Sequence, residues 1–130
     1  MSTITMEIGG LRFATTLSGA AGRTAAALLA RLPVEDRIVH GRWSGPLCLL
    51  RRINLGVPLE HPVMMLSAGD IVYHPAHFDI AIVYGTTQFI EMTGPVAVTH
   101  LGRLSGDLAA LAGLGESVQA RGATTIVITR

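Results

Sequence analysis

The chain has 130 residues, of which 49% are hydrophobic and only 15% are charged, and its net charge is +1 at neutral pH. This composition is typical of a folded globular protein of single-domain size and excludes a disordered chain. A net charge so close to zero excludes an electrostatic basis for binding nucleic acid. We therefore expect one folded domain over residues 1–130.

The chain shows no sign of a membrane or secretion segment. Its mean hydropathy of +0.47 is high for a soluble protein, but no apolar run approaches the roughly 18 residues that a membrane helix needs. We assign the excess of hydrophobic residues to a closed barrel and to contact between copies in a homo-oligomer. The start of the chain lacks the basic and apolar regions of a signal peptide. Cys48 is the single cysteine, which excludes an internal disulfide and indicates a reducing cytoplasm.

The first part of the chain predicts a hairpin followed by a helix. Thr3–Ile8 and Leu11–Thr15 alternate polar and apolar residues on either side of Gly9-Gly10, a pair that suits a tight two-residue turn. Apolar residues then recur at helical spacing from Ala21 to Leu32, and Ser18 can cap the start of that helix.

Strands and one long connection follow. Glu35–Trp43 and Leu47–Leu50 are predicted strands, separated by a turn. Arg51–Ser67 contains two prolines and is predicted to be a long loop, with a short strand near Val63–Leu66. Loops of this length inside a compact domain are often functional.

The second half of the chain centres on a hairpin. Ile71–Tyr73 and Ile80–Tyr84 are apolar runs joined by a proline-containing connection, as in two neighbouring antiparallel strands. The remaining predicted elements are strands at Gln88–Met92 and Val96–Leu101, a helix from Leu104 to Val118 with Ser105 as its cap and Asp107 near its start, and a last strand at Thr124–Thr129. About eight strands and two helices favour a small barrel, because strands must close or cover their edges.

Several strings resemble a known group of proteins. Arg23–Leu29 followed by Leu32-Pro33 is similar to the first helix of cyclophilin-like domains. Trp43-Ser44-Gly45, Gly69–Pro75 and Tyr84-Gly85 resemble strings of an uncharacterised prokaryotic family with that fold. The resemblance implies a mostly β chain with two helices that forms a cyclophilin-like closed eight-stranded β-barrel, and membership of a family without assigned activity.

The resemblance to peptidyl-prolyl isomerases is incomplete. Val39-His40-Gly41-Arg42 only echoes their Phe-His-Arg string, and their Phe-Met-x-Gln-Gly-Gly-Asp string is absent. The same fold occurs in subunits of allophanate hydrolase and 5-oxoprolinase, which open or cleave small amides. For this chain that comparison is an analogy of fold alone.

One group of candidate site residues surrounds the turn after the strand at Glu35–Trp43. Arg42 can fork onto a carboxylate or polarise a carbonyl, Trp43 can form the floor of a pocket, and Ser44 can bind substrate; His40 lies beside them. The alternative is a surface arginine, a core tryptophan and a turn serine.

Two further groups complete the candidate site. Glu60 and His61 can transfer protons if a pocket shifts their pKa values, although adjacent residues of an extended segment point apart. Tyr73 and Tyr84 can present hydroxyl groups to a ligand from the central hairpin, and Thr86 is a weaker candidate of the same kind; both tyrosines are equally compatible with the barrel wall.

A metal is the remaining alternative. His74, His77 and Asp79 carry side chains that suit zinc, iron or nickel, but the histidine–glutamate pattern of cupin metal sites is absent. We therefore assign no metal and no cofactor. His100 and Cys48 are expected to be a satisfied core histidine and an inert buried thiol.

The sequence thus predicts a protein that binds a small molecule bearing an amide or a carboxylate, with Arg42, Glu60 and His61 in catalytic roles of a hydrolase or isomerase type. The alternatives are a non-enzymatic sensor, an accessory subunit that docks a catalytic partner, and a residual prolyl isomerase. All of them depend on the turn at Trp43 and the tyrosine-bearing hairpin facing one cavity.

Overall fold

The structure is a computed structural model that describes residues 2–130. The helices are α1 (Gly22–Arg31) and α2 (Leu108–Arg121), with short 3-10 helices at Gly19–Ala21 (η1) and Arg42–Ser44 (η2). The strands are β1 (Thr3–Ile8), β2 (Leu11–Leu17), β3 (Val34–His40), β4 (Leu47–Leu50), β5 (Pro62–Val63), β6 (Met65–Leu66), β7 (Asp70–His74), β8 (Asp79–Val83), β9 (Thr87–Gln88), β10 (Ile90–Glu91), β11 (Gly94–Pro95), β12 (Val98–Ser105) and β13 (Thr124–Thr129).

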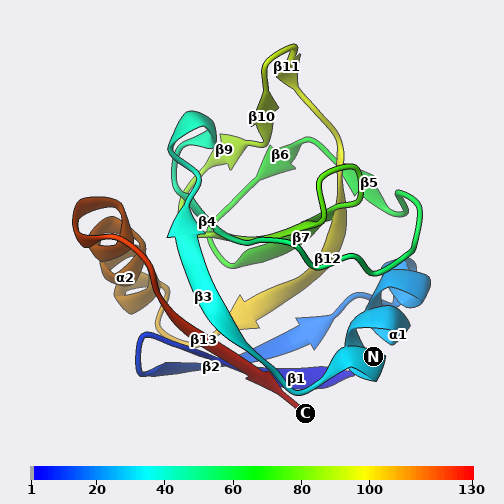
Figure 1. Cartoon of the computed structure of the whole chain (residues 1–130), viewed down its shortest axis with the longest axis horizontal. Helices are drawn as coiled ribbons and strands as arrows, with labels where there is room; N and C mark the ends of the chain where they lie inside the picture. The colour runs from blue at the N-terminus through cyan, green and yellow to red at the C-terminus, as the bar shows by residue number, and fades with distance from the viewer. Residues whose placement is uncertain (1) are drawn as a thin grey trace.

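Eight strands form a closed antiparallel barrel, which confirms the predicted fold class. Their order is β2-β1-β13-β3-β4-β8-β7-β12, and β12 pairs back onto β2. The two helices lie outside the barrel, with α2 beside β3 and β4 and α1 near the opposite edge (Figure 1). The short strands β6, β9, β10 and β11 lie together at one end, at the top in Figure 1.

A glycine permits the contact that closes the barrel. A Cβ atom at Gly102 would collide with the carbonyl oxygen of Thr16 on the neighbouring strand β2. The register of β12 against β7 shifts between His100 and Gly102, as at a β-bulge. β12 can therefore pair with both β7 and β2.

Strands β4, β7 and β8 are buried on both faces, which explains why their sequences are continuous apolar runs. Alternate residues face two separate apolar clusters. Ile71 and Tyr73 belong to the main core inside the barrel, whereas Val72 packs outside it against Phe89 and its neighbours. This second cluster lies under the short strands at the end of the molecule.

The structure differs from the sequence-based elements at the start of α2. β12 continues to Ser105 because its last residues pair with β2, so Ser105 is a strand residue and the prediction that it caps a helix is wrong. The cap is Asp107, whose Oδ1 accepts a hydrogen bond from the Ala110 amide at 3.0 Å. A glycine in the helix, Gly115, leaves room for the ring of Tyr84, as expected for a glycine that permits close packing.

Within residues 2–130, neither helix has the length and apolar character required to cross a membrane.

Candidate functional site

A well-formed cavity lies at the end of the molecule that carries the short strands. It has a volume of about 340 Å³ and a mostly apolar lining. Its walls come from η2, from the residue after β4, from the β7–β8 hairpin and from β10, and comprise Trp43, Arg51, His77, Asp79, Phe89, Ile90, Glu91 and Met92. Segments distant in sequence therefore build the cavity.

The β7–β8 hairpin supplies its polar end. His74 and Asp79 are a cross-strand pair at the end of the two strands, and both side chains are almost completely buried. Their position in the alternation places them on the side of the second apolar cluster, with Val72 and Ala81. The connecting turn then curls back, because the amide of Phe78 donates to the His74 carbonyl oxygen at 2.9 Å.

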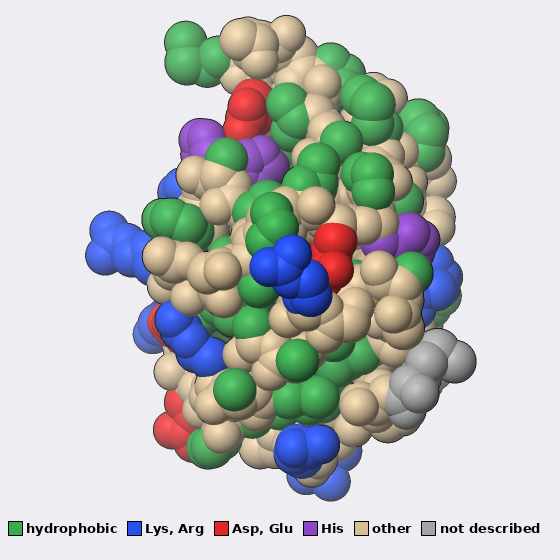
Figure 2. Space-filling view, turned by 90° about the vertical axis from the view of Figure 1, so that its right-hand side faces the viewer, with side chains coloured by type: hydrophobic (Ala, Val, Ile, Leu, Met, Phe, Trp, Pro, Cys, Tyr) green, Lys and Arg blue, Asp and Glu red, His purple; other side chains and the backbone are tan. Residues whose placement is uncertain are grey.

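Two histidines and a glutamate meet at this end of the cavity. The Nε2 atom of His74 lies 2.8 Å from Oε1 of Glu91, and the Nε2 atom of His77 lies 3.2 Å from the same oxygen. The two imidazole rings are edge to face, with centroids 4.8 Å apart. Phe89 stacks on the His74 ring at 5.0 Å. Figure 2 shows histidine side chains beside an acidic one at the upper left of the face that it presents.

The environment of His74 favours its neutral form. Burial lowers the pKa of His74 and outweighs the carboxylate of Glu91, which acts in the opposite direction. The amide of His77 donates to Nδ1 of His74 at 3.2 Å, so the proton of the neutral ring is on Nε2 and is donated to Glu91. The carboxylate of Glu91 accordingly accepts a hydrogen bond from Nε2 of His74.

Arg51 provides a cation at the same end. Its Nε lies 3.3 Å from Oδ1 of the buried Asp79, while about half of the arginine side chain is exposed. Its two terminal nitrogens make no hydrogen bond within residues 2–130. They remain available to a carboxylate or carbonyl group of a ligand.

The apolar wall consists of Trp43 and the chain around β10. Trp43 is 54% exposed and Met92 is fully exposed. Hydrophobic side chains also gather at this end of the molecule in Figure 2. Ser44 holds β10 in place, because its Oγ accepts a hydrogen bond from the Ile90 amide at 2.9 Å.

Of the candidate residues predicted from the sequence, the structure places Trp43 in this cavity and Ser44 directly behind its wall. Arg42 points away, since its guanidinium donates to the carbonyl oxygen of Gln119 in α2 at 2.7 Å. Thr86 is exposed and its side chain makes no hydrogen bond within residues 2–130.

The tyrosines do not share the cavity with Trp43. Tyr73 is fully buried in the main core, where its hydroxyl donates to the Ile53 carbonyl oxygen and accepts from the Leu55 amide. The Tyr84 hydroxyl lies 2.6 Å from Nε2 of His40, beneath α2. Burial raises the pKa of Tyr84, and burial together with the charge of Arg42 lowers the pKa of His40. The expected convergence of the two regions on one cavity is therefore not what the structure shows.

Glu60 and His61 point apart, although the backbone at His61 is not extended and has a φ of 43°. Oε1 of Glu60 accepts a hydrogen bond from the Thr24 amide at 2.6 Å, at the start of α1. Nδ1 of His61 lies 3.5 Å from Oγ of Ser18 and 3.3 Å from the His100 carbonyl oxygen.

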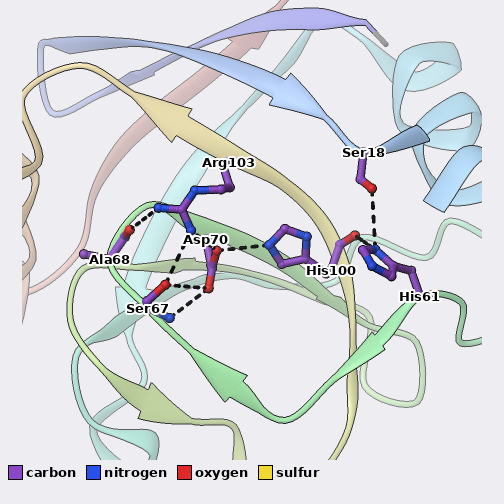
Figure 3. A network of polar contacts seen from close by, with 7 residues as sticks. All are labelled: Ser18, His61, Ser67, Ala68, Asp70, His100 and Arg103. Carbon is purple, nitrogen blue, oxygen red and sulfur yellow. Dashed lines mark hydrogen bonds and ion pairs between the residues drawn. The ribbon is translucent and has the colours of Figure 1, made fainter. Parts of the chain in front are cut away.

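His61 belongs to a second polar network on another side of the barrel (Figure 3). Oδ1 of Asp70 is bonded to Nε2 of His100 at 3.0 Å and to the guanidinium of Arg103, and Oδ2 accepts from the Ser67 amide at 2.8 Å. Ser18 and His61 resemble part of a serine-hydrolase triad, but Ser18 already accepts a hydrogen bond from the Ala20 amide. With its Nδ1 donating to the His100 carbonyl oxygen, His61 is not a base toward Ser18.

Sequence reasoning missed Glu91, Arg51 and Phe89. Glu91 lies in the two-residue strand β10, inside the predicted strand at Gln88–Met92, where nothing in the sequence indicated a site, and Arg51 opens a segment predicted only as a loop. The buried position of His74 was available as a signal, because it extends an apolar strand at the correct period.

Comparisons with known proteins give a family and two solved structures of similar fold. A family model described as "Protein of unknown function (DUF3830)" matches residues 4–130. No curated protein matches the chain. Among solved structures, the chain is similar to McbB in complex with tryptophan, with a TM-score of 0.83 and 15% identity over 98% of this chain and 44% of the McbB chain.

It is also similar to the hypothetical protein AF2241 from Archaeoglobus fulgidus, with a TM-score of 0.69 and 17% identity over 98% of this chain and 93% of the other. This chain spans less than half the length of McbB. At these identities the likeness concerns the fold.

Proposed function

This chain belongs to the DUF3830 family of unknown function, and we propose that it binds a small planar metabolite in the cavity beside Trp43. The observation that carries the proposal is the cavity itself. It combines a volume of about 340 Å³ and mostly apolar walls with polar groups gathered at one end. Small-molecule sites have this construction, with a few polar groups that orient an otherwise apolar ligand.

The chemistry of the walls defines the ligand class. Trp43 and Phe89 offer aromatic surface to a planar ring, and the free nitrogens of Arg51 bind a carboxylate or an amide oxygen. Glu91 adds an anionic acceptor for an amine or an amide N–H. The best match is an aromatic amino acid or its amide. Because McbB, a barrel of this fold, is known in complex with tryptophan, that amino acid is the first ligand to test.

The experiment uses the single tryptophan of the chain as a reporter. Tyrosine, phenylalanine, aromatic carboxylates and small cyclic amides are titrated by intrinsic fluorescence, and tryptophan is titrated by calorimetry. Binding should shift the Trp43 emission and saturate. Trp43→Ala should then weaken binding by about tenfold or more in calorimetry, since burying a large aromatic side chain contributes roughly 1.5–3 kcal/mol.

Leu59→Ala is the matched control, because Leu59 is an exposed apolar residue outside the cavity. Arg51→Gln should weaken the binding of carboxylate ligands and leave the binding of their neutral amides unchanged. Absence of saturable binding across the panel, or equal affinities for Trp43→Ala and Leu59→Ala, would contradict the proposal.

Turnover at the same site is the enzymatic form of this proposal. His77 has an exposed imidazole that Glu91 holds at 3.2 Å, which is the arrangement of a general base with an orienting carboxylate. We expect small cyclic amides to be opened, as detected by mass spectrometry. Ligand binding with every amide left intact identifies a sensor instead, which is the non-enzymatic alternative.

A further inference from the structure

We propose that His74, His77 and Glu91 form a binding site for a divalent transition metal ion of the zinc and iron class. This deepens the proposed function, and it rests on that function only for the ligand that would share the cavity with the ion; with an ion bound, His77 is a metal ligand and no longer a general base. The sequence alone gave no reason to join the three residues, because the carboxylate comes from β10 and the histidines from the β7–β8 hairpin.

The donor set and its geometry carry the proposal. Two imidazole nitrogens and one carboxylate oxygen are all within 4.8 Å of one another. Two ligands that are each about 2.1 Å from a tetrahedral ion are roughly 3.4 Å apart. The Nε2 atom of His77 is already close to this distance from Oε1 of Glu91, at 3.2 Å. The Nε2 atom of His74, now 2.8 Å from the same oxygen, would have to move only slightly away from it.

The surroundings favour an ion over a simple hydrogen-bonded cluster. The His74 ring is buried and fixed by the stacked Phe89, so its Nε2 atom points at Glu91 without rotational freedom. Asp79 is a second buried carboxylate in the cross-strand position next to His74. Because Asp79 is already paired with Arg51, Glu91 supplies the negative charge for a divalent cation, and three protein ligands leave positions open toward the cavity, as in catalytic zinc sites.

Metal binding requires one rearrangement. The amide of His77 now donates to Nδ1 of His74, so the ring carries its proton on Nε2. An ion at Nε2 takes that position and the ring proton moves to Nδ1, which costs the hydrogen bond from the His77 amide and the contacts of both Nε2 atoms with Glu91. Two metal–imidazole bonds and a metal–carboxylate bond replace them, and their combined free energy exceeds that of the hydrogen bonds lost.

Cobalt(II) tests the site directly, because its visible absorption reports the ligands and does not depend on any activity. The protein is treated with a chelator, dialysed and titrated with Co²⁺, and Zn²⁺ is then added as a competitor. We expect one equivalent to bind with absorption bands of a four- or five-coordinate ion, and Zn²⁺ to displace it. Glu91→Gln, which is nearly isosteric, should weaken binding by about tenfold or more.

His77→Ala removes a half-exposed ligand on a surface turn, and its folding is checked by circular dichroism. It should abolish stoichiometric binding. His61→Ala is the matched control, because this histidine belongs to the separate network of Asp70 and His100. Weak Co²⁺ binding that His77→Ala and Glu91→Gln leave unchanged, or that His61→Ala abolishes, would overturn the metal site.

The two proposals fail separately. Stoichiometric Co²⁺ binding without any ligand from the panel would leave the metal site standing and reject the aromatic ligand. Chelator-treated protein that binds a panel ligand through Trp43 but takes up no metal would retain the proposed function and reject the metal site.

Discussion

Glu60 supplies the cap of a helix that is distant from it in sequence. The residue before α1 is Ala21, which has no side chain able to cap, and the Thr24 amide instead donates to Glu60 at 2.6 Å. This hydrogen bond lowers the pKa of Glu60 and outweighs the opposing effect of burial. The carboxylate also lies favourably at the positive end of the helix dipole.

Glu60→Ala should therefore destabilise the protein by about 1 kcal/mol, the usual cost of losing a helix N-cap. Glu60→Gln keeps an acceptor and should cost less. Urea unfolding measures both, and Glu35→Ala is the control, because Glu35 is exposed on β3. Unchanged stability in Glu60→Ala, with an altered affinity for a panel ligand, would favour the site role expected from the sequence.

Cys48 gives a second prediction at this scale. The thiol is buried in the main core, and burial raises its pKa to about 12. The reactive thiolate is therefore nearly absent near neutral pH. We expect a disulfide reagent to leave the folded protein unmodified and to label one thiol per chain in denaturant. Rapid labelling of the folded protein would show that the thiol is accessible.

Single residues show how far sequence reasoning reached. It identified Trp43 as a pocket residue, and it expected a buried Cys48 and a hydrogen-bonded His100, as the structure shows; the inertness of Cys48 stays a prediction. It also placed an arginine at the site, but chose Arg42 where the cavity has Arg51. Residue type indicates what a side chain can do, whereas its direction depends on a backbone turn and on distant partners such as the carbonyl of Gln119.

Among the elements, β10 depends most on a single side chain. It is a two-residue strand paired only with β11, and the buried Ser44 accepts a hydrogen bond from its Ile90 amide. Thr87 also donates to the Ser44 carbonyl oxygen. β10 carries Glu91, so this anchor positions the acidic group of the cavity.

Ser44→Ala should destabilise the protein by about 1–2 kcal/mol, because it leaves the Ile90 amide without its acceptor in a buried environment. It should also weaken ligand and Co²⁺ binding through Glu91. Ser105→Ala removes an exposed hydroxyl that donates to the Ala14 carbonyl oxygen and is the control for urea unfolding. Equal effects of the two substitutions would remove the proposed role of Ser44 as the anchor of β10.

Long elements were predicted closely, whereas the short strands near Val63–Leu66 and at Gln88–Met92 were located only roughly. Strong alternation and the glycine pair revealed the β1–β2 hairpin, and continuous apolar runs revealed β4, β7 and β8. Strands of two residues have no period to detect. The sequence indicated one strand at Gln88–Met92, where the structure has β9 and β10, and β10 lines the cavity through Ile90 and Glu91. The end of β12 was assigned to a helix because its leucine fits helical spacing, and pairing with β2 decided the outcome.

For the whole molecule, Asp70 links the strands near the seam of the barrel. It lies on β7 and binds His100 and Arg103 of β12 together with the Ser67 amide. Burial alone would raise the pKa of Asp70, but the Ser67 amide, His100 and Arg103 outweigh it, and the pKa of this carboxyl lies below its ordinary value.

This shift has a definite sign in the dependence of stability on pH. Because the folded-state pKa is depressed, the contribution of Asp70 is complete above the ordinary aspartate pKa of about 4 and is lost as the pH falls through the folded-state value. The stability gap between wild type and Asp70→Asn should be constant near neutrality and shrink in acid. Urea unfolding over a pH series measures the gap, and the exposed Asp36→Asn is the control. A gap that widens in acid would contradict the assignment.

The barrel and its closure followed from the number and pattern of strands, and the solved neighbours confirm the architecture. The resemblance also led to a family of unknown function, which the family model supports. The position of the cavity could not be predicted from the sequence pattern, because it depends on which face of the sheet the short strands cover. That choice is made by long-range contacts such as those of Phe89 with the second apolar cluster.

Because β7 and β8 are buried on both faces, the two sides of the cavity should differ in the rate at which their amide hydrogens exchange. Amide hydrogens of this hairpin should exchange with deuterium only upon global unfolding, whereas those of the thin β10–β11 ribbon should exchange through local opening. His74 and Asp79 thus lie on strands that stay folded, whereas Glu91 lies on a segment that opens locally. A bound ligand or ion should therefore be visible first as protection of Ile90 and Glu91, with hardly any change in the strands beneath them.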